Sequence, residues 1–135
     1  WTVPIIYNSI LNNRNLLKLD IEGSEYSIVD KINQNSSKIK VLIIEFHFIR
    51  SKKKMFIDSV KKLIKNFDIV HIHANNYFNL TNKDAFFEVL EISFVNKKIN
   101  KYRKNFRYNF PLKNLDFECF PDRKKIKFSF KIKHK

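Results

Sequence analysis

Glycine is almost absent from this chain: Gly23 is the only one among 135 residues. Proteins carry roughly 7% glycine on average, and phosphate-binding loops of the GxGxxG or Walker type need several glycines close together. The sequence therefore excludes both types of loop. If the chain handles a nucleotide-like cofactor, other residues must hold it.

Cysteine and long apolar runs are also scarce. Cys119 is the only cysteine, which excludes a disulfide within the chain and a zinc site built from several cysteines. No apolar run approaches the ~20 residues of a membrane span. The sequence also shows no positively charged start followed by an apolar stretch, which is the pattern of a secretion signal. We therefore expect a soluble, cytoplasmic protein in a reducing compartment. The chain begins with Trp1 rather than Met, so we also expect it to be a fragment.

The net charge of +14 is concentrated in the last third of the chain. Residues 97–135 contain 14 Lys and Arg against three acidic residues, whereas residues 1–96 contain 13 against 10. A base-skewed genome or an anionic partner would each explain such a tail, but no RNA-binding motif accompanies it. We expect its lysines to protect a sheet edge, and we keep a basic nucleic-acid-binding or RNA-modifying module as an alternative.

Hydrophobic periodicity alternates between strand and helix patterns along the first 96 residues. Strands are predicted over residues 15–21, 40–47, 68–73 and 86–95. Helices are predicted over residues 24–33, with Ser24 as the capping residue, and over 51–66. This order predicts an α/β domain with a mostly parallel sheet, an antiparallel final strand pair, and helices on the faces.

Residues 97–135 differ in character from the rest. Pro111 and Pro121 bracket a stretch that reads as an irregular covering segment, and residues 126–132 alternate apolar with basic side chains. We predict that residues 1–96 form the α/β part, and that residues 97–135 add a basic covering segment and an edge strand to the same domain.

Acidic and imidazole side chains stand near the ends of three predicted strands. Residues two apart on a strand point the same way, which pairs Asp20 with Glu22, Glu45 with His47, and His71 with His73. If the three strands are neighbours, these side chains converge at the edge where open α/β sheets bind ligands. Such a group suits deprotonation of a substrate hydroxyl. Two histidines and a carboxylate would also suit a divalent metal, but spacing alone does not lead us to expect a metal site.

We assign roles to these side chains and their neighbours. Catalytic roles go to Asp20, Glu22, His47 and His73. Substrate-binding roles go to Glu25, Glu45, His71, Asn75 and Asn76. Structural roles stay open, since an acid can cap the following helix, Glu45 and His47 could form a buried pair, and asparagines suit a turn. Gly23 is expected to serve the backbone conformation rather than contact with substrate.

Five segments resemble, in the same order, successive motifs of the FkbM-type methyltransferases. They are residues 17–26 (LKLDIEGSEY), 43–47 (IIEFH), 71–77 (HIHANNY), 89–94 (VLEISF) and 111–117 (PLKNLDF). The resemblance covers about residues 1–130 and only the carboxyl-terminal part of that family's domain. It implies a partial Rossmann-like class I methyltransferase fold, with the first predicted strand as the fourth of that fold and the others as its fifth, sixth and seventh.

The resemblance also implies an activity. S-adenosylmethionine would be the cofactor, and the acceptor would be a hydroxyl on a saccharide or another small metabolite. The glycine-rich half that holds most of the cofactor in this family has no counterpart here, so no cofactor-binding residue is assigned. A non-catalytic or partner-dependent remnant is therefore the other alternative.

Overall fold

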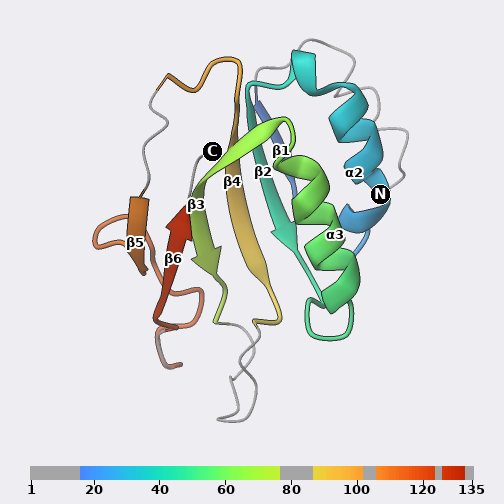
Figure 1. The fold of residues 1–135 in the computed structure, drawn as a ribbon. Helices are drawn as coiled ribbons and strands as arrows, with labels where there is room; N and C mark the ends of the chain where they lie inside the picture. Colours follow the sequence, from blue (N-terminus) through green and yellow to red (C-terminus); the bar gives the residue numbers. More distant parts are fainter. Residues whose placement is uncertain (1–15, 77–86, 102–105, 124–125, 133–135) are drawn as a thin grey trace.

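The computed structural model describes residues 16–76, 87–101, 106–123 and 126–132 (Figure 1). The six predicted helices and strands of the first 96 residues are all present, although residues 15 and 86, at the ends of two of them, lie outside the described residues. In chain order the elements are β1 (Leu16–Leu19), α2 (Glu25–Gln34), a short 3-10 helix (Ser36–Lys38), β2 (Val41–Phe46), α3 (Lys53–Leu63), β3 (Phe67–Ala74), β4 (Leu90–Asn96), β5 (Phe106–Phe110) and β6 (Phe128–Ile132).

The main sheet has the order β1-β2-β4-β3. β1 and β2 pair in parallel, and β4 runs antiparallel to both β2 and β3. β1, β2 and β3 therefore run in one direction, and the predicted antiparallel pairing of the last two strands is confirmed. The prediction that the three acid- and histidine-bearing strands are neighbours is wrong for β2 and β3, because β4 lies between these two strands in the sheet.

Helices on the faces of the sheet were expected, and the two helices of the described residues lie side by side on one face of the main sheet (Figure 1). Alternate residues of β2 are buried toward them, and Phe46 packs its ring against Tyr26 of α2 and Phe56 of α3. The register places Phe46 opposite Leu90 of β4, whose alternate residues are buried in the same way. The core therefore lies between the helices and the middle of the sheet, and the polar alternate residues of the strands lie on the opposite face.

A second sheet of two antiparallel strands, β5 and β6, lies beside β3 (Figure 1). The strand predicted over residues 126–132 is present as β6, but its partner is β5, which the sequence did not predict. Phe110 of β5 stacks on Phe128 of β6 and contacts the ring of His71. The small sheet thus packs on the helix-free side of β3. None of the described helices is long and apolar enough to cross a membrane.

Candidate active site

The tight turn after β1 brings two acidic side chains to one place. Ser24 N–H donates to the carbonyl of Ile21 (3.2 Å), and the two residues between them have positive φ angles, 52° at Glu22 and 95° at Gly23. A β-carbon at Gly23 would lie 2.7 Å from the ring of Phe48, so the glycine is required for both backbone conformation and packing. The left-handed conformation of Glu22 costs about 1–2 kcal/mol, which the rest of the turn must offset.

Glu25 holds this turn together from the first turn of α2. Its side chain is completely buried, and Oε1 accepts hydrogen bonds from Ile21 N–H (3.2 Å) and Gly23 N–H (3.1 Å). Ser24 is the capping residue of α2, as predicted, but its side chain makes no capping hydrogen bond. The carboxylate of Glu25 binds N–H groups of the preceding turn rather than those of the helix, and at this position the helix dipole also favours its negative charge.

The same oxygen of Glu25 orients His47, which follows the end of β2. His47 Nδ1 lies 2.9 Å from Oε1, and Tyr26 donates its hydroxyl proton to the His47 carbonyl. A carboxylate only accepts hydrogen bonds, so Nδ1 carries a proton and the neutral ring keeps its lone pair on Nε2. Ring and backbone of His47 are therefore both fixed by α2.

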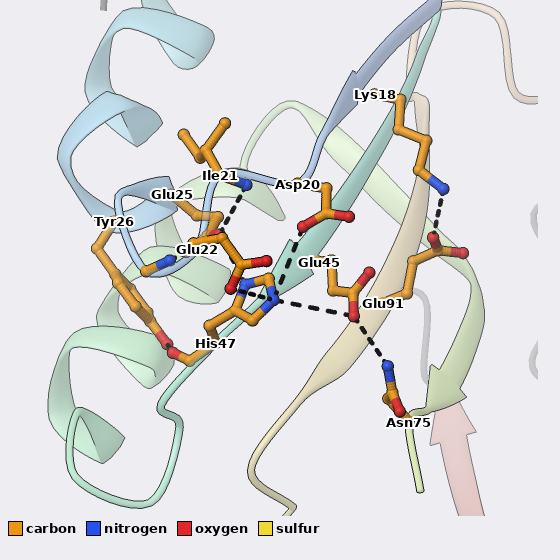
Figure 2. Close-up of polar contacts among 11 residues, drawn as sticks. Lys18, Asp20, Ile21, Glu22, Glu25, Tyr26, Glu45, His47, Asn75 and Glu91 are labelled. Atoms are coloured by element: carbon orange, nitrogen blue, oxygen red, sulfur yellow. Dashed lines mark hydrogen bonds and ion pairs between the residues drawn. The ribbon is translucent and has the colours of Figure 1, made fainter. Parts of the chain in front are cut away.

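Three further carboxylates surround Nε2 of His47 (Figure 2). The nearest oxygens are those of Glu22 at 3.6 Å, Asp20 at 3.7 Å and Glu45 at 4.0 Å, all beyond ordinary hydrogen-bond length. The His47 side chain is only 10% exposed, whereas those of Asp20 and Glu22 are 48% and 81% exposed. The cluster, defined here as Asp20, Glu22 and His47, is therefore rigid on its histidine side and open to solvent on its carboxylate side.

The cluster's charges act on the pKa of His47. Burial of the ring lowers this pKa, but the hydrogen bond to Glu25 and the negative charges of Glu25, Glu22 and Glu45 outweigh burial, so the pKa lies above its ordinary value. A base works best when its pKa lies near the working pH. His47 is thus a basic nitrogen that carboxylates both orient and make more basic.

Glu45 and Asn75 adjoin the cluster from β2 and from the end of β3. Asn75 Nδ2 donates to Glu45 Oε1 at 3.1 Å, so one asparagine predicted to bind substrate contacts a carboxylate predicted to do the same (Figure 2). Next to Glu45, its β4 register partner Glu91 forms an ion pair of 2.9 Å with Lys18 of β1. These contacts extend the polar face of the sheet from β1 to β3.

His71 and His73 make a different set of contacts. Both imidazoles lie close to Asp116 Oδ1, at 2.8 Å and 3.1 Å, while Asp116 Oδ2 accepts the Leu112 N–H at 2.6 Å. Burial raises the pKa of Asp116, but these hydrogen bonds and the charge of His71 outweigh burial, so the pKa is lowered. The structure therefore separates the two β3 histidines from the cluster and joins them to an acid that the sequence did not single out.

The side-chain amide of Asn76 is hydrogen-bonded to the backbone rather than free to bind a substrate. Its side chain is buried and pairs with the backbone of Phe120 in both directions, donating to the carbonyl at 2.8 Å and accepting from the N–H at 3.0 Å. Asn76 also lines an open pocket together with His73 of β3, Asp116, and apolar residues of β3 and of residues 110–128. This pocket does not include the cluster.

A comparison with models of protein families finds one family that this chain matches. The family model described as the methyltransferase FkbM domain matches residues 3–78, which is more than half of the chain and includes everything from β1 to β3. The match contains the whole cluster and Glu25, whereas Asp116 lies beyond it. Neither the curated proteins nor the solved structures gave a match. This chain belongs to the FkbM methyltransferase domain family.

Proposed function

We propose that this chain forms the acceptor side of an S-adenosylmethionine-dependent methyltransferase that methylates a hydroxyl on a saccharide or another small metabolite. Family membership supports methyl transfer in general. The strand order β1-β2-β4-β3 fits an assignment of these strands to the fourth, fifth, seventh and sixth positions of a Rossmann-like class I fold. The cluster then lies at the carboxyl ends of two parallel neighbours, where open α/β sheets bind ligands.

One observation carries the proposal: Nε2 of His47 has a lone pair, is fixed by buried Glu25, and faces the exposed carboxylates of Asp20 and Glu22. A sugar or metabolite hydroxyl is far too weak an acid to react at neutral pH without a base or an electrostatic aid. In our account the hydroxyl hydrogen-bonds to the cluster, its O–H bond breaks, and the proton passes to the cluster while the electron pair stays on oxygen.

The residues around the cluster have distinct proposed roles. Asp20 and Glu22 orient the hydroxyl and stabilise the protonated cluster, since their oxygens lie within 3.7 Å of Nε2. Glu25 acts through His47 as a positioning residue, because its buried side chain does not reach solvent. Glu45, held by Asn75, adds a second acceptor beside the cluster. We still propose that His71 and His73 contact the substrate, and we add Asp116 to this group.

S-adenosylmethionine is the methyl donor that the family implies, and when bound it supplies an electrophilic methyl group. The described residues do not form the glycine-rich cradle that this fold class uses for such a cofactor. The only glycine, Gly23, is needed for the positive φ angle of the turn and for the close packing of Phe48. We therefore assign none of these residues to the cofactor, and the proposal concerns only the acceptor side.

A comparison of metabolites tests the proposal. Saccharides and small metabolites are extracted from cells of the source organism with the gene deleted, and from the same cells with the gene restored, and their masses are compared. We expect at least one methyl ether to disappear on deletion and its unmethylated parent, ~14 Da lighter, to accumulate. Unchanged methyl ethers in the deletion would refute the proposal and favour a non-catalytic remnant. Loss of a methyl group from RNA instead would favour the RNA-modifying alternative.

A further inference from the structure

The cluster has the composition and spacing of a metal site. One ligand atom from each of Asp20, Glu22 and His47 can be chosen so that all three lie within 4.8 Å of one another. Ligands each ~2.1 Å from a shared ion lie about 3.0 Å apart when adjacent and about 4.2 Å apart when opposite. The distances of 3.6 Å and 3.7 Å from Nε2 to the two carboxylates lie between these two spacings, so a shift of about half an ångström would bring the ligand atoms to adjacent positions around an ion.

His47 is prepared as a metal ligand by a contact independent of the two acids. Metal-binding histidines usually donate their other ring N–H to a carboxylate or carbonyl, which fixes the tautomer and aims the lone pair. Glu25 supplies that carboxylate at 2.9 Å, from a completely buried position. Nε2 belongs to a side chain that is nine-tenths buried, and the three carboxylate oxygens facing it all lie beyond hydrogen-bond length. Among the described residues, Nε2 of this mostly buried side chain therefore has no hydrogen-bond partner, and it faces the carboxylates of Asp20 and Glu22; this is the second observation that points to a ligand.

We propose that Asp20, Glu22 and His47 bind one divalent cation, with Glu25 as the positioning residue behind the histidine. Two carboxylates and one imidazole favour a hard cation that accepts nitrogen, and Mn²⁺ fits this set better than a thiolate-seeking ion does. Spacing along the chain did not predict a metal site at these three residues, because it is the turn at Gly23 and the end of β2 that bring them together.

The cation would help to activate the acceptor hydroxyl, and this one step rests on the proposed function. Asp20 and Glu22 are exposed, so the remaining coordination positions face solvent and can take the acceptor hydroxyl. A bound cation lowers the pKa of an oxygen that coordinates it. The cation would change which group takes the proton: it would occupy the lone pair of Nε2, so the hydroxyl proton would pass to Glu45, whose oxygen lies 4.0 Å from Nε2, instead of to the cluster. The O–H bond would break with its electron pair left on the hydroxyl oxygen.

Titration of the metal-free protein with MnCl₂ by calorimetry tests the site directly. Neither methyl donor nor acceptor is present, so the result is independent of whether the protein transfers methyl groups. We expect one Mn²⁺ per chain, competed by Mg²⁺, and a loss of affinity of about 100-fold or more in Asp20→Asn, Glu22→Gln and His47→Gln. Nitrogen coupling in the electron paramagnetic resonance spectrum of bound Mn²⁺ should vanish in His47→Gln.

Asp30→Asn is the matched control, because Asp30 is an exposed acid on α2 that pairs with Lys62 at 2.7 Å. It should bind Mn²⁺ within twofold of the parent protein. Glu22→Gln keeps the test valid if His47→Gln fails to fold, since the Glu22 side chain is largely exposed. No saturable binding, or equal binding by the parent, Glu22→Gln and Asp30→Asn, would overturn the proposal. Failure of the metabolite comparison with intact Mn²⁺ binding would refute only the methyl-transfer role.

Discussion

Replacing Glu25 by glutamine keeps the shape of the side chain and removes a buried negative charge. Oε1 of Glu25 accepts three hydrogen bonds, from Ile21 N–H, Gly23 N–H and His47 Nδ1. A hydrogen bond to a charged group contributes about 1.5–3 kcal/mol and a neutral one about 0.5–1.5 kcal/mol, so each of the three weakens by about 1 kcal/mol. Glutamine also removes the free-energy cost of burying a charge at this position, which offsets part of this loss.

The second oxygen of Glu25 adds to the cost. Oε2 is buried and has no hydrogen-bond partner among the described residues, so the amide nitrogen of glutamine would sit there as an unpaired donor. An unpaired buried group costs about 1–3 kcal/mol, and the expected total is a loss of about 3 kcal/mol in the free energy of unfolding. The matched control is Glu22→Gln, whose side chain is 81% exposed, and its free energy of unfolding should stay within about 0.5 kcal/mol of the parent.

Urea denaturation of both variants, in a chelating buffer, measures the difference. A purely structural role for Glu25 would change stability alone, so a second readout is needed. The pKa of His47, measured by NMR and assigned with His47→Gln, should fall in Glu25→Gln because the negative charge is lost and the hydrogen bond to Nδ1 weakens. If Glu25→Gln is as stable as Glu22→Gln and leaves the pKa of His47 unchanged, our reasoning about the positioning contact is refuted.

Three further predictions concern Gly23, Asp116 and the basic residues 97–135. Gly23→Ala should lower the free energy of unfolding by about 1–2 kcal/mol in urea denaturation, because φ is 95° and the new β-carbon would meet Phe48; an alanine variant of parent stability would contradict this. The pKa of Asp116 is lowered in the folded state, so its stabilising effect is present above the unfolded value of about 3.9 and is lost as pH falls through the folded pKa. Asp116→Asn should therefore unfold more easily at pH 7 and show a shallower loss of stability below about pH 4, and parallel pH profiles would count against it. Binding of generic RNA by the basic residues 97–135 should be weak and lost at high salt in a filter assay, whereas a sequence preference that persists at high salt would favour a nucleic-acid role.

Much of the fold could be predicted because local patterns decide it. Residues of β2 and β4 alternate or run apolar, and the helical spacing from Phe56 to Leu63 marks α3. β5 escaped prediction because residues 106–110 gain their order from pairing with β6, about 20 residues later. The place of β4 between β2 and β3 is likewise set by pairing over long distances, which periodicity does not record.

The site was predicted in part for the same reason. Asp20, Glu22 and His47 could be named from strand ends and period-two spacing, and the structure brings these three together. Spacing also grouped His73 with them, but its partner is Asp116, 43 residues away in the chain. The buried role of Glu25 was equally hidden, since a carboxylate at the start of a helix looks the same in sequence whether it faces solvent or a histidine.

The most direct measurement of the central claim compares Asp20→Asn with Asp30→Asn for the rate of formation of the methyl ether identified in the deletion comparison. Asp20 lies 3.7 Å from Nε2 of His47 in the cluster, whereas Asp30 pairs with Lys62 on the surface of the helices. A group that takes part in deprotonation contributes ~10²–10⁴-fold, so we predict a rate at least about 100-fold lower for Asp20→Asn and within twofold of the parent for Asp30→Asn. An Asp20→Asn protein that forms the methyl ether within a few-fold of the parent rate would contradict the assignment of the cluster as the acceptor site.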